Sequence, residues 1–224
     1  MAEEHRRNRA AGKIDPGSLS SSLADMNNIQ FWFKADSLGL NDNDYVSVWT
    51  DESGNYRDAT QGTEASQPIF KTNVIGNLPA CRFANDSLGH EAVQYSSSTW
   101  FVVWSRNSAT ANDVVMIYDA ASYAYLQYSS LWYVYTSAST TVAMATGTFS
   151  LKSCVYDGVN YQRYTNGSAE ASQVGTGPGE YRYIGSGFGV FGGDIAEIAI
   201  FDTNLSTADR QYVENYLNGK YSLW

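Results

Sequence analysis

The chain has few of the side chains on which metal sites and most enzymes depend. Its 224 residues include only two cysteines and two histidines. These four residues are widely spread: His5, Cys81, His90 and Cys154. Because zinc sites draw their ligands from closely spaced pairs, we expect no metal site and no cofactor. Both cysteines lie in strand-like segments, where buried thiols are the favoured interpretation and a disulfide is the alternative.

The sequence also lacks a complete calcium-binding loop. Asp42 and Asp44 resemble the start of an EF-hand loop, but the glycine and the distal glutamate of such a loop are missing. This favours a solvated turn at residues 41–44.

Long apolar runs and positive charge are scarce as well. No stretch approaches about 18 apolar residues, so the sequence predicts no membrane-spanning segment. Residues 1–17 lack the apolar stretch of a signal peptide, and we expect none. The formal net charge is −9, and residues 1–15 carry +1, which leaves −10 for the rest. Because nucleic-acid binding needs a basic face, the sequence disfavours that class of partner.

No pattern of carboxylates or nucleophiles predicts catalysis. A glycosidase needs two carboxylates flanking one bond, and the best pair in the sequence is Asp194 and Glu197. Strand side chains alternate between two faces, so a spacing of three predicts that these carboxylates lie on opposite faces. Neither His5 nor His90 stands near a recognisable nucleophile turn. We therefore expect no catalytic residue and no enzymatic activity.

The sequence does contain a succession of strand patterns. Residues 29–35 place Phe31 and Phe33 on one side of a strand and Trp32 on the other. Asn166-Gly167 is the strongest short hairpin signal. Four prolines and nineteen glycines indicate turns built from Gly, Asn and Asp, as in β-sandwiches. Two further runs are apolar enough for strands covered on both faces: residues 99–104 and 195–201.

The chain ends in one amphipathic helix pattern. Ser206, followed three residues later by Asp209, forms a near capping box, and Gly219 is the expected stop signal. Residues at helical spacing predict the buried face: Ala208, Tyr212, Val213, Tyr216 and Leu217. Such a helix predicts a lid or brace for the sheets that precede it.

Several blocks resemble the LamG-like jelly roll of the concanavalin A-like lectin/glucanase superfamily over residues 29–224. The blocks are, in order, FWFKAD (31–36), WTDESGN (49–55), DATQ (58–61), QP (67–68), LPACRF (78–83), DG (157–158), YTNG (164–167), GGDIAEI (192–198) and the helix 205–221. The resemblance implies two packed antiparallel sheets. Hydrolytic members carry a Glu-x-Asp-x-x-Glu string, and its absence here weighs against a glucanase. The fold hosts lectins, glycosidases and structural modules alike, so it implies function poorly.

We therefore predict an all-β, two-sheet antiparallel jelly-roll sandwich with one C-terminal helix over residues 28–224. An extended N-terminal arm, residues 1–27, precedes it and is too polar to fold alone. Four basic residues of the arm are candidates for pairing with acidic groups on a partner: Arg6, Arg7, Arg9 and Lys13. A solvated tail is the alternative.

A tyrosine-rich segment, residues 123–135, supplies the candidate ligand site. Its six candidate residues are Tyr123, Tyr125, Tyr128, Trp132, Tyr133 and Tyr135. Tyrosine has an apolar body and a polar tip, which suits a surface that stacks on sugar rings or on another protein. Ordinary sheet packing is the alternative.

These features favour a non-catalytic virion structural protein, of the capsid decoration, cement or fibre type. In this hypothesis the arm docks into the capsid shell or another virion protein, and the jelly roll is displayed on the virion surface, where it binds glycans. The alternative is a stand-alone, extracellular carbohydrate-binding lectin-like module. A glycoside hydrolase is the third hypothesis. Self-association into a homo-oligomer stays open.

Overall fold

The computed structural model describes residues 22–107, 116–117, 145–170, 172–174, 180–185 and 191–224. Most of the predicted arm, with its four basic residues, lies outside these ranges. All six aromatic candidates of residues 123–135 lie outside them as well.

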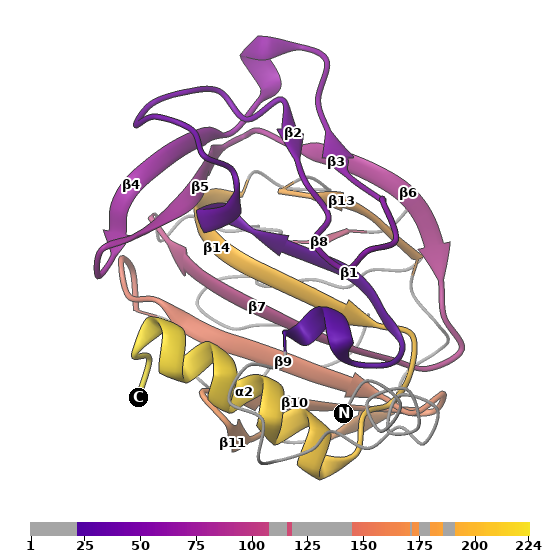
Figure 1. The fold of residues 1–224 in the computed structure, drawn as a ribbon. Helices are drawn as coiled ribbons and strands as arrows, with labels where there is room; N and C mark the ends of the chain where they lie inside the picture. The colour runs from indigo at the N-terminus through magenta and orange to yellow at the C-terminus, as the bar shows by residue number, and fades with distance from the viewer. Residues whose placement is uncertain (1–21, 108–115, 118–144, 171, 175–179, 186–190) are drawn as a thin grey trace, which may run out of the picture.

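Two antiparallel sheets form the fold, which confirms the predicted two-sheet β-sandwich with a C-terminal helix (Figure 1). The first sheet has the order β11-β10-β9-β7-β14-β5-β4, with β1 on β14 and β12 on β10. Its strands are β1 (Ile29–Lys34), β4 (Ile69–Ile75), β5 (Leu78–Ala84), β7 (Ser98–Arg106), β9 (Ser150–Tyr156), β10 (Asn160–Thr165), β11 (Ser168–Ala169), β12 (Gln173–Val174) and β14 (Gly192–Phe201).

The second sheet has the order β2-β3-β6-β13-β8. Its strands are β2 (Val48–Trp49), β3 (Ala59–Thr60), β6 (Leu88–Gln94), β8 (Met116–Ile117) and β13 (Glu180–Ile184). Short 3₁₀ turns and one α-helix complete the described elements: η1 (Leu23–Asp25), η2 (Ala35–Ser37), η3 (Glu64–Ser66) and α2 (Thr207–Tyr221). None of these helices has the length and apolar character that a bilayer crossing requires.

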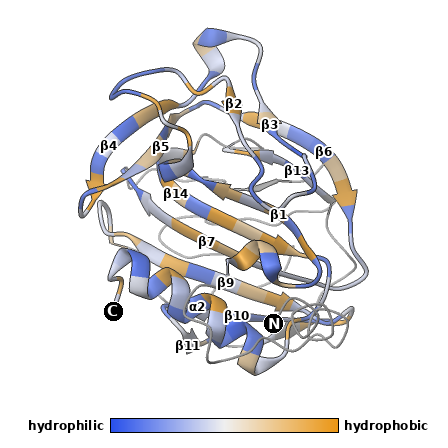
Figure 2. Ribbon diagram, in the orientation of Figure 1, coloured by the Kyte–Doolittle hydropathy of each residue, from blue (hydrophilic) through white to orange (hydrophobic). Residues whose placement is uncertain are grey.

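One apolar layer lies on each face of the first sheet. Phe31 and Phe33 enter the core between the two sheets, whereas Trp32 faces the opposite side, as the alternation predicts. The second layer lies beneath α2 and η1, and Figure 1 shows α2 lying across β9 and β10. Because β7 and β14 are covered on both faces, every residue of β7 is buried, and apolar positions run along β14 (Figure 2).

Two residues within the range predicted for the arm are buried in the fold. Leu23 and Met26, which the sequence places in the arm, are buried in the layer beneath α2. A deletion meant to remove only the arm must therefore end before Ser22.

The helix differs from its prediction in two respects. Arg210 and Glu214 lie on the buried face, whereas Ala208 is exposed. Gly219 does not end the helix, which continues to Tyr221 and stops at Ser222 in a left-handed conformation (φ 52°). The start is as expected, because Ser206 Oγ accepts the N–H of Asp209 at 3.2 Å.

Both cysteines are buried free thiols, which confirms the favoured interpretation over the disulfide. Burial raises the pKa of both thiols. Each therefore serves as a small apolar core residue.

Candidate functional site

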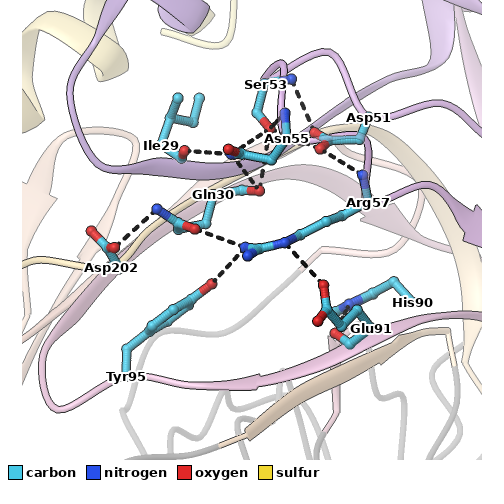
Figure 3. A network of polar contacts seen from close by, with 10 residues as sticks. All are labelled: Ile29, Gln30, Asp51, Ser53, Asn55, Arg57, His90, Glu91, Tyr95 and Asp202. Carbon is cyan, nitrogen blue, oxygen red and sulfur yellow. Dashed lines mark hydrogen bonds and ion pairs between the residues drawn. The ribbon is translucent and has the colours of Figure 1, made fainter.

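A loop of residues 50–58 connects β2 to β3 and covers the open edge of β1. The N–H of Trp32 donates to Oδ1 of Asp51 at 2.9 Å. Nδ2 of Asn55 donates to the carbonyl oxygen of Ile29 at 2.9 Å (Figure 3). The polar residues of the WTDESGN block thus fix this loop against β1. The N–H of Glu52 also donates to the carbonyl oxygen of Trp32 at 2.8 Å. Together, these backbone and side-chain bonds take the place of a neighbouring strand at this edge of β1.

The same loop positions Arg57, whose guanidinium contacts three residues of β1 and of the β6 segment (Figure 3). Its Nη1 donates to Oε1 of Gln30 on β1 at 2.7 Å and lies 3.5 Å from the hydroxyl of Tyr95. Its Nε pairs with Glu91 of β6 at 3.1 Å. Gln30 in turn donates from Nε2 to Asp202, just after β14, at 2.9 Å. We call these residues the Arg57 cluster: Gln30, Arg57, Glu91, Tyr95 and Asp202.

The cluster is half-buried, and burial sets the charges around it. Burial raises the pKa of Tyr95 to about 12, so its phenol stays neutral and can both donate and accept. Burial also raises the pKa of Asp202 from its usual value. His90 packs against the ring of Phe31, with centroids 4.6 Å apart, and burial lowers its pKa to about 4. At neutral pH the imidazole therefore contributes no positive charge.

Tyr56 lies next to Arg57 in the loop and is 91% exposed. Its φ of 59° is in the left-handed region, which side chains with a Cβ rarely adopt. Such a conformation costs on the order of 1–3 kcal/mol and is concentrated at functional sites. An aromatic ring is thus held in solvent at an energetic cost, one residue before Arg57 in the same loop.

Another exposed tyrosine lies on the outer face of the second sheet. Tyr183 of β13 is 37% exposed, and one edge of its ring occupies the space above Gly89, where an added Cβ would lie 3.3 Å from the ring. The residues paired across four strands in this row are Val48, Thr60, Gly89 and Tyr183. This row is a second aromatic surface, but it offers fewer hydrogen-bonding side chains than the Arg57 cluster.

The carboxylates considered for catalysis do not lie on opposite faces, so that prediction was wrong. A register shift between Ile195 and Glu197 in the pairing of β14 with β7 breaks the alternation, and both Asp194 and Glu197 face away from the inter-sheet core. Each is buried and fully engaged. Asp194 accepts two bonds from Arg82, at 2.7 and 2.9 Å.

Glu197 ties the sheet to the end of α2. Its two carboxylate oxygens accept from Trp32 Nε1 at 2.6 Å, from Lys220 Nζ at 2.7 Å and from the hydroxyl of Tyr221 at 2.8 Å. These three contacts indicate a structural role for the Glu197 carboxylate.

A lysine side chain pairs with the turn at residues 41–44. Lys71 Nζ lies 3.1 Å from Oδ2 of Asp42 and donates to Oδ1 of Asn43 at 2.7 Å. The N–H of Thr72 also donates to Asp42, and together these bonds lower the pKa of that carboxyl group. Among the described residues, no group of three or more His, Cys, Asp and Glu side chains could hold a metal ion.

The Arg57 cluster was not predicted from the sequence. The WTDESGN block marked its supporting loop, but no local signal connects residues 30, 57, 91, 95 and 202. A tyrosine and an arginine directly after a motif of turn residues are the one sequence signal that could have drawn attention to it.

No family model and no curated protein matches the sequence. Several solved structures match in fold. Domain 4 of AbnA, an extracellular GH43 arabinanase from Geobacillus stearothermophilus in complex with arabinotriose, has a TM-score of 0.59 at 17% identity, covering 81% of this chain and 95% of that chain. The binding domain of Paraclostridial Mosquitocidal Protein 1 has a TM-score of 0.60 at 10% identity, covering 88% and 53%.

Trypanosoma rangeli sialidase in complex with sialic acid matches with a TM-score of 0.59 at 11% identity, covering 95% of this chain and 37% of that chain. The chain thus spans nearly the whole arabinanase domain, about half of the toxin binding domain and about a third of the sialidase. At these identities the likeness establishes the β-sandwich fold alone. None of these three matches is described as a virion protein.

Proposed function

We propose that this domain is a non-catalytic carbohydrate-binding module whose sugar site comprises the Arg57 cluster and Tyr56. The observation that carries the proposal is Tyr56, an exposed, left-handed aromatic residue that directly precedes Arg57 in the loop. Binding sites for small polar molecules combine an apolar or aromatic surface with a few fixed hydrogen-bonding groups. An exposed tyrosine ring can stack on the apolar face of a sugar, and the adjacent amide, guanidinium and carboxylate groups can bond its hydroxyls.

Two further observations support the proposal. The fold is shared with an arabinanase domain whose structure is described in complex with arabinotriose. In addition, the two carboxylates best placed in sequence for glycosidase chemistry are buried and engaged with Arg82, Trp32, Lys220 and Tyr221. The virion role, the docking of the arm and the aromatic site of residues 123–135 stay predictions.

The test measures sugar binding and stability together in Tyr56→Gly. Glycine adopts a positive φ without strain, so this variant should be as stable as the wild type or more stable by up to about 1 kcal/mol. Loss of the ring should weaken binding at least about tenfold, or 1.4 kcal/mol. Calorimetry with a panel of oligosaccharides that includes arabinotriose, together with thermal unfolding, provides both readouts.

Two variants serve as controls. Tyr45→Ala removes an exposed tyrosine outside the cluster and should leave affinity unchanged. Tyr183→Ala removes the ring on the outer sheet face. If Tyr183→Ala abolishes binding while Tyr56→Gly does not, the site has been assigned to the wrong surface. If no sugar of the panel binds the wild type with a Kd of about 1 mM or tighter, the proposed function is wrong.

A further inference from the structure

We infer that the Arg57 cluster selects uncharged sugars and rejects sugars that carry a carboxylate. This inference rests on the proposed function and adds the class of ligand. It favours one of the two kinds of ligand found with the matching structures. Arabinotriose is neutral, whereas sialic acid is an acid.

The balance of charge at the site disfavours an acidic ligand. Arg57 is the cation of the cluster, and Glu91 already lies 3.1 Å from its Nε. Asp202 is joined to the guanidinium through Gln30, with hydrogen bonds of 2.9 and 2.7 Å. Asp51 accepts the backbone N–H of Arg57 at 3.1 Å. Arg57 thus lies among three carboxyl groups, of which Glu91 contacts its guanidinium directly, Asp51 bonds its backbone and Asp202 is linked to it through Gln30.

No neighbouring imidazole changes this balance. His90 packs against Phe31 and Phe33 and is uncharged at neutral pH. At long range, the formal net charge of −9 adds to the repulsion of anions.

The groups that a ligand would contact also favour a neutral sugar. A charge-assisted bond from arginine to a carboxylate is the strongest contact the site could offer an acidic sugar, and Glu91 already makes it. A ligand carboxylate bound to the same guanidinium would lie beside Glu91 and near Asp202, which is a like-charge arrangement.

A hydroxyl group meets no such conflict. It can donate to Glu91, whose side chain is 64% exposed, and accept from Arg57 or Tyr95. The cluster therefore offers both donors and acceptors, and the hydroxyls of a neutral sugar can bond to either.

The experiment compares matched ligands on the full chain. The tightest neutral oligosaccharide of the panel is titrated beside the same oligosaccharide with its primary hydroxyl oxidised to a carboxylate. We expect the acid to bind at least about tenfold more weakly at low salt, with the difference shrinking as salt screens the repulsion. Affinity for the neutral sugar should not change with salt.

Glu91→Gln tests whether the cluster itself sets this preference. The variant removes one carboxylate from Arg57 and should narrow the ratio of neutral to acidic affinity. Glu64→Gln, at an exposed residue of η3, makes the same change in net charge elsewhere and should leave the ratio unchanged. Equal or tighter binding of the acid, or an equal effect of the two variants, overturns the inference while the proposed function stands. Binding of neither ligand overturns both.

Discussion

At the residue scale, His90 shows how burial changes a side chain's chemistry. Its ring centroid lies 4.6 Å from that of Phe31 and 6.0 Å from that of Phe33, and Nδ1 lies 2.9 Å from the carbonyl oxygen of Glu91. A carbonyl can only accept, so Nδ1 carries the proton. The charged groups nearby are Asp51, Arg57 and Glu91, but burial is the largest influence and lowers the pKa to about 4.

This shift predicts a pH dependence of stability. The unfolded chain takes up a proton at this residue below about pH 6.5, whereas the folded chain does so only near pH 4. The stabilisation is therefore complete above pH 6.5 and is lost as the pH falls from 6.5 to 4. The loss is on the order of 3 kcal/mol.

Denaturant unfolding of the wild type and of His90→Gln across this interval measures the effect. Because glutamine does not titrate, the difference in unfolding free energy between the two proteins should shrink as the pH falls. A difference that is constant with pH would contradict the buried, neutral imidazole.

At the scale of elements, the boundaries of α2 give a direct comparison of sequence and structure. Gly219 satisfies the sequence pattern for a helix stop, yet it lies inside the helix, and nothing lies within 4 Å of the position that its Cβ would occupy. The left-handed residue is Ser222, where the N–H donates to the carbonyl of Asn218 at 2.7 Å. The last turn is retained because Lys220 and Tyr221 bond to Glu197, a contact that no local pattern contains.

Gly219→Ala should therefore stabilise the protein by about 0.5–1 kcal/mol, because alanine has the higher helix propensity. If Gly219 were the left-handed stop, the same change would destabilise the fold by a similar or larger amount. Chemical unfolding of the variant and the wild type gives the sign. Ser222→Gly, which relieves a positive φ at the observed end, should also stabilise.

Strand positions were predictable where burial imposes a pattern and unpredictable where the register shifts. The alternation of Phe31, Trp32 and Phe33 was read correctly, because each face of β1 has its own apolar layer. The faces of Asp194 and Glu197 were misread, because a register shift adds one residue between them and no sequence feature marks it.

At the scale of the whole molecule, the sandwich was predictable because strand periodicity and turn residues repeat along the chain. The Arg57 cluster was not predictable, because it forms only when the open edge of β1, the β2–β3 loop, the end of β6 and the end of β14 come together. Gln30 and Asp202 are 172 residues apart in sequence. Such proximity follows from β1 pairing with β14, which a single sequence does not contain.

The central claim is that sugars bind at the Arg57 cluster, and mapping the bound sugar by NMR tests it most directly. Backbone amide shifts are followed while the tightest oligosaccharide of the panel is titrated into the full chain. We predict the largest amide shift changes at residues 30, 56, 57, 91 and 95, with little change around Tyr183. Changes concentrated on the outer face of the second sheet, or in residues 123–135, would contradict it.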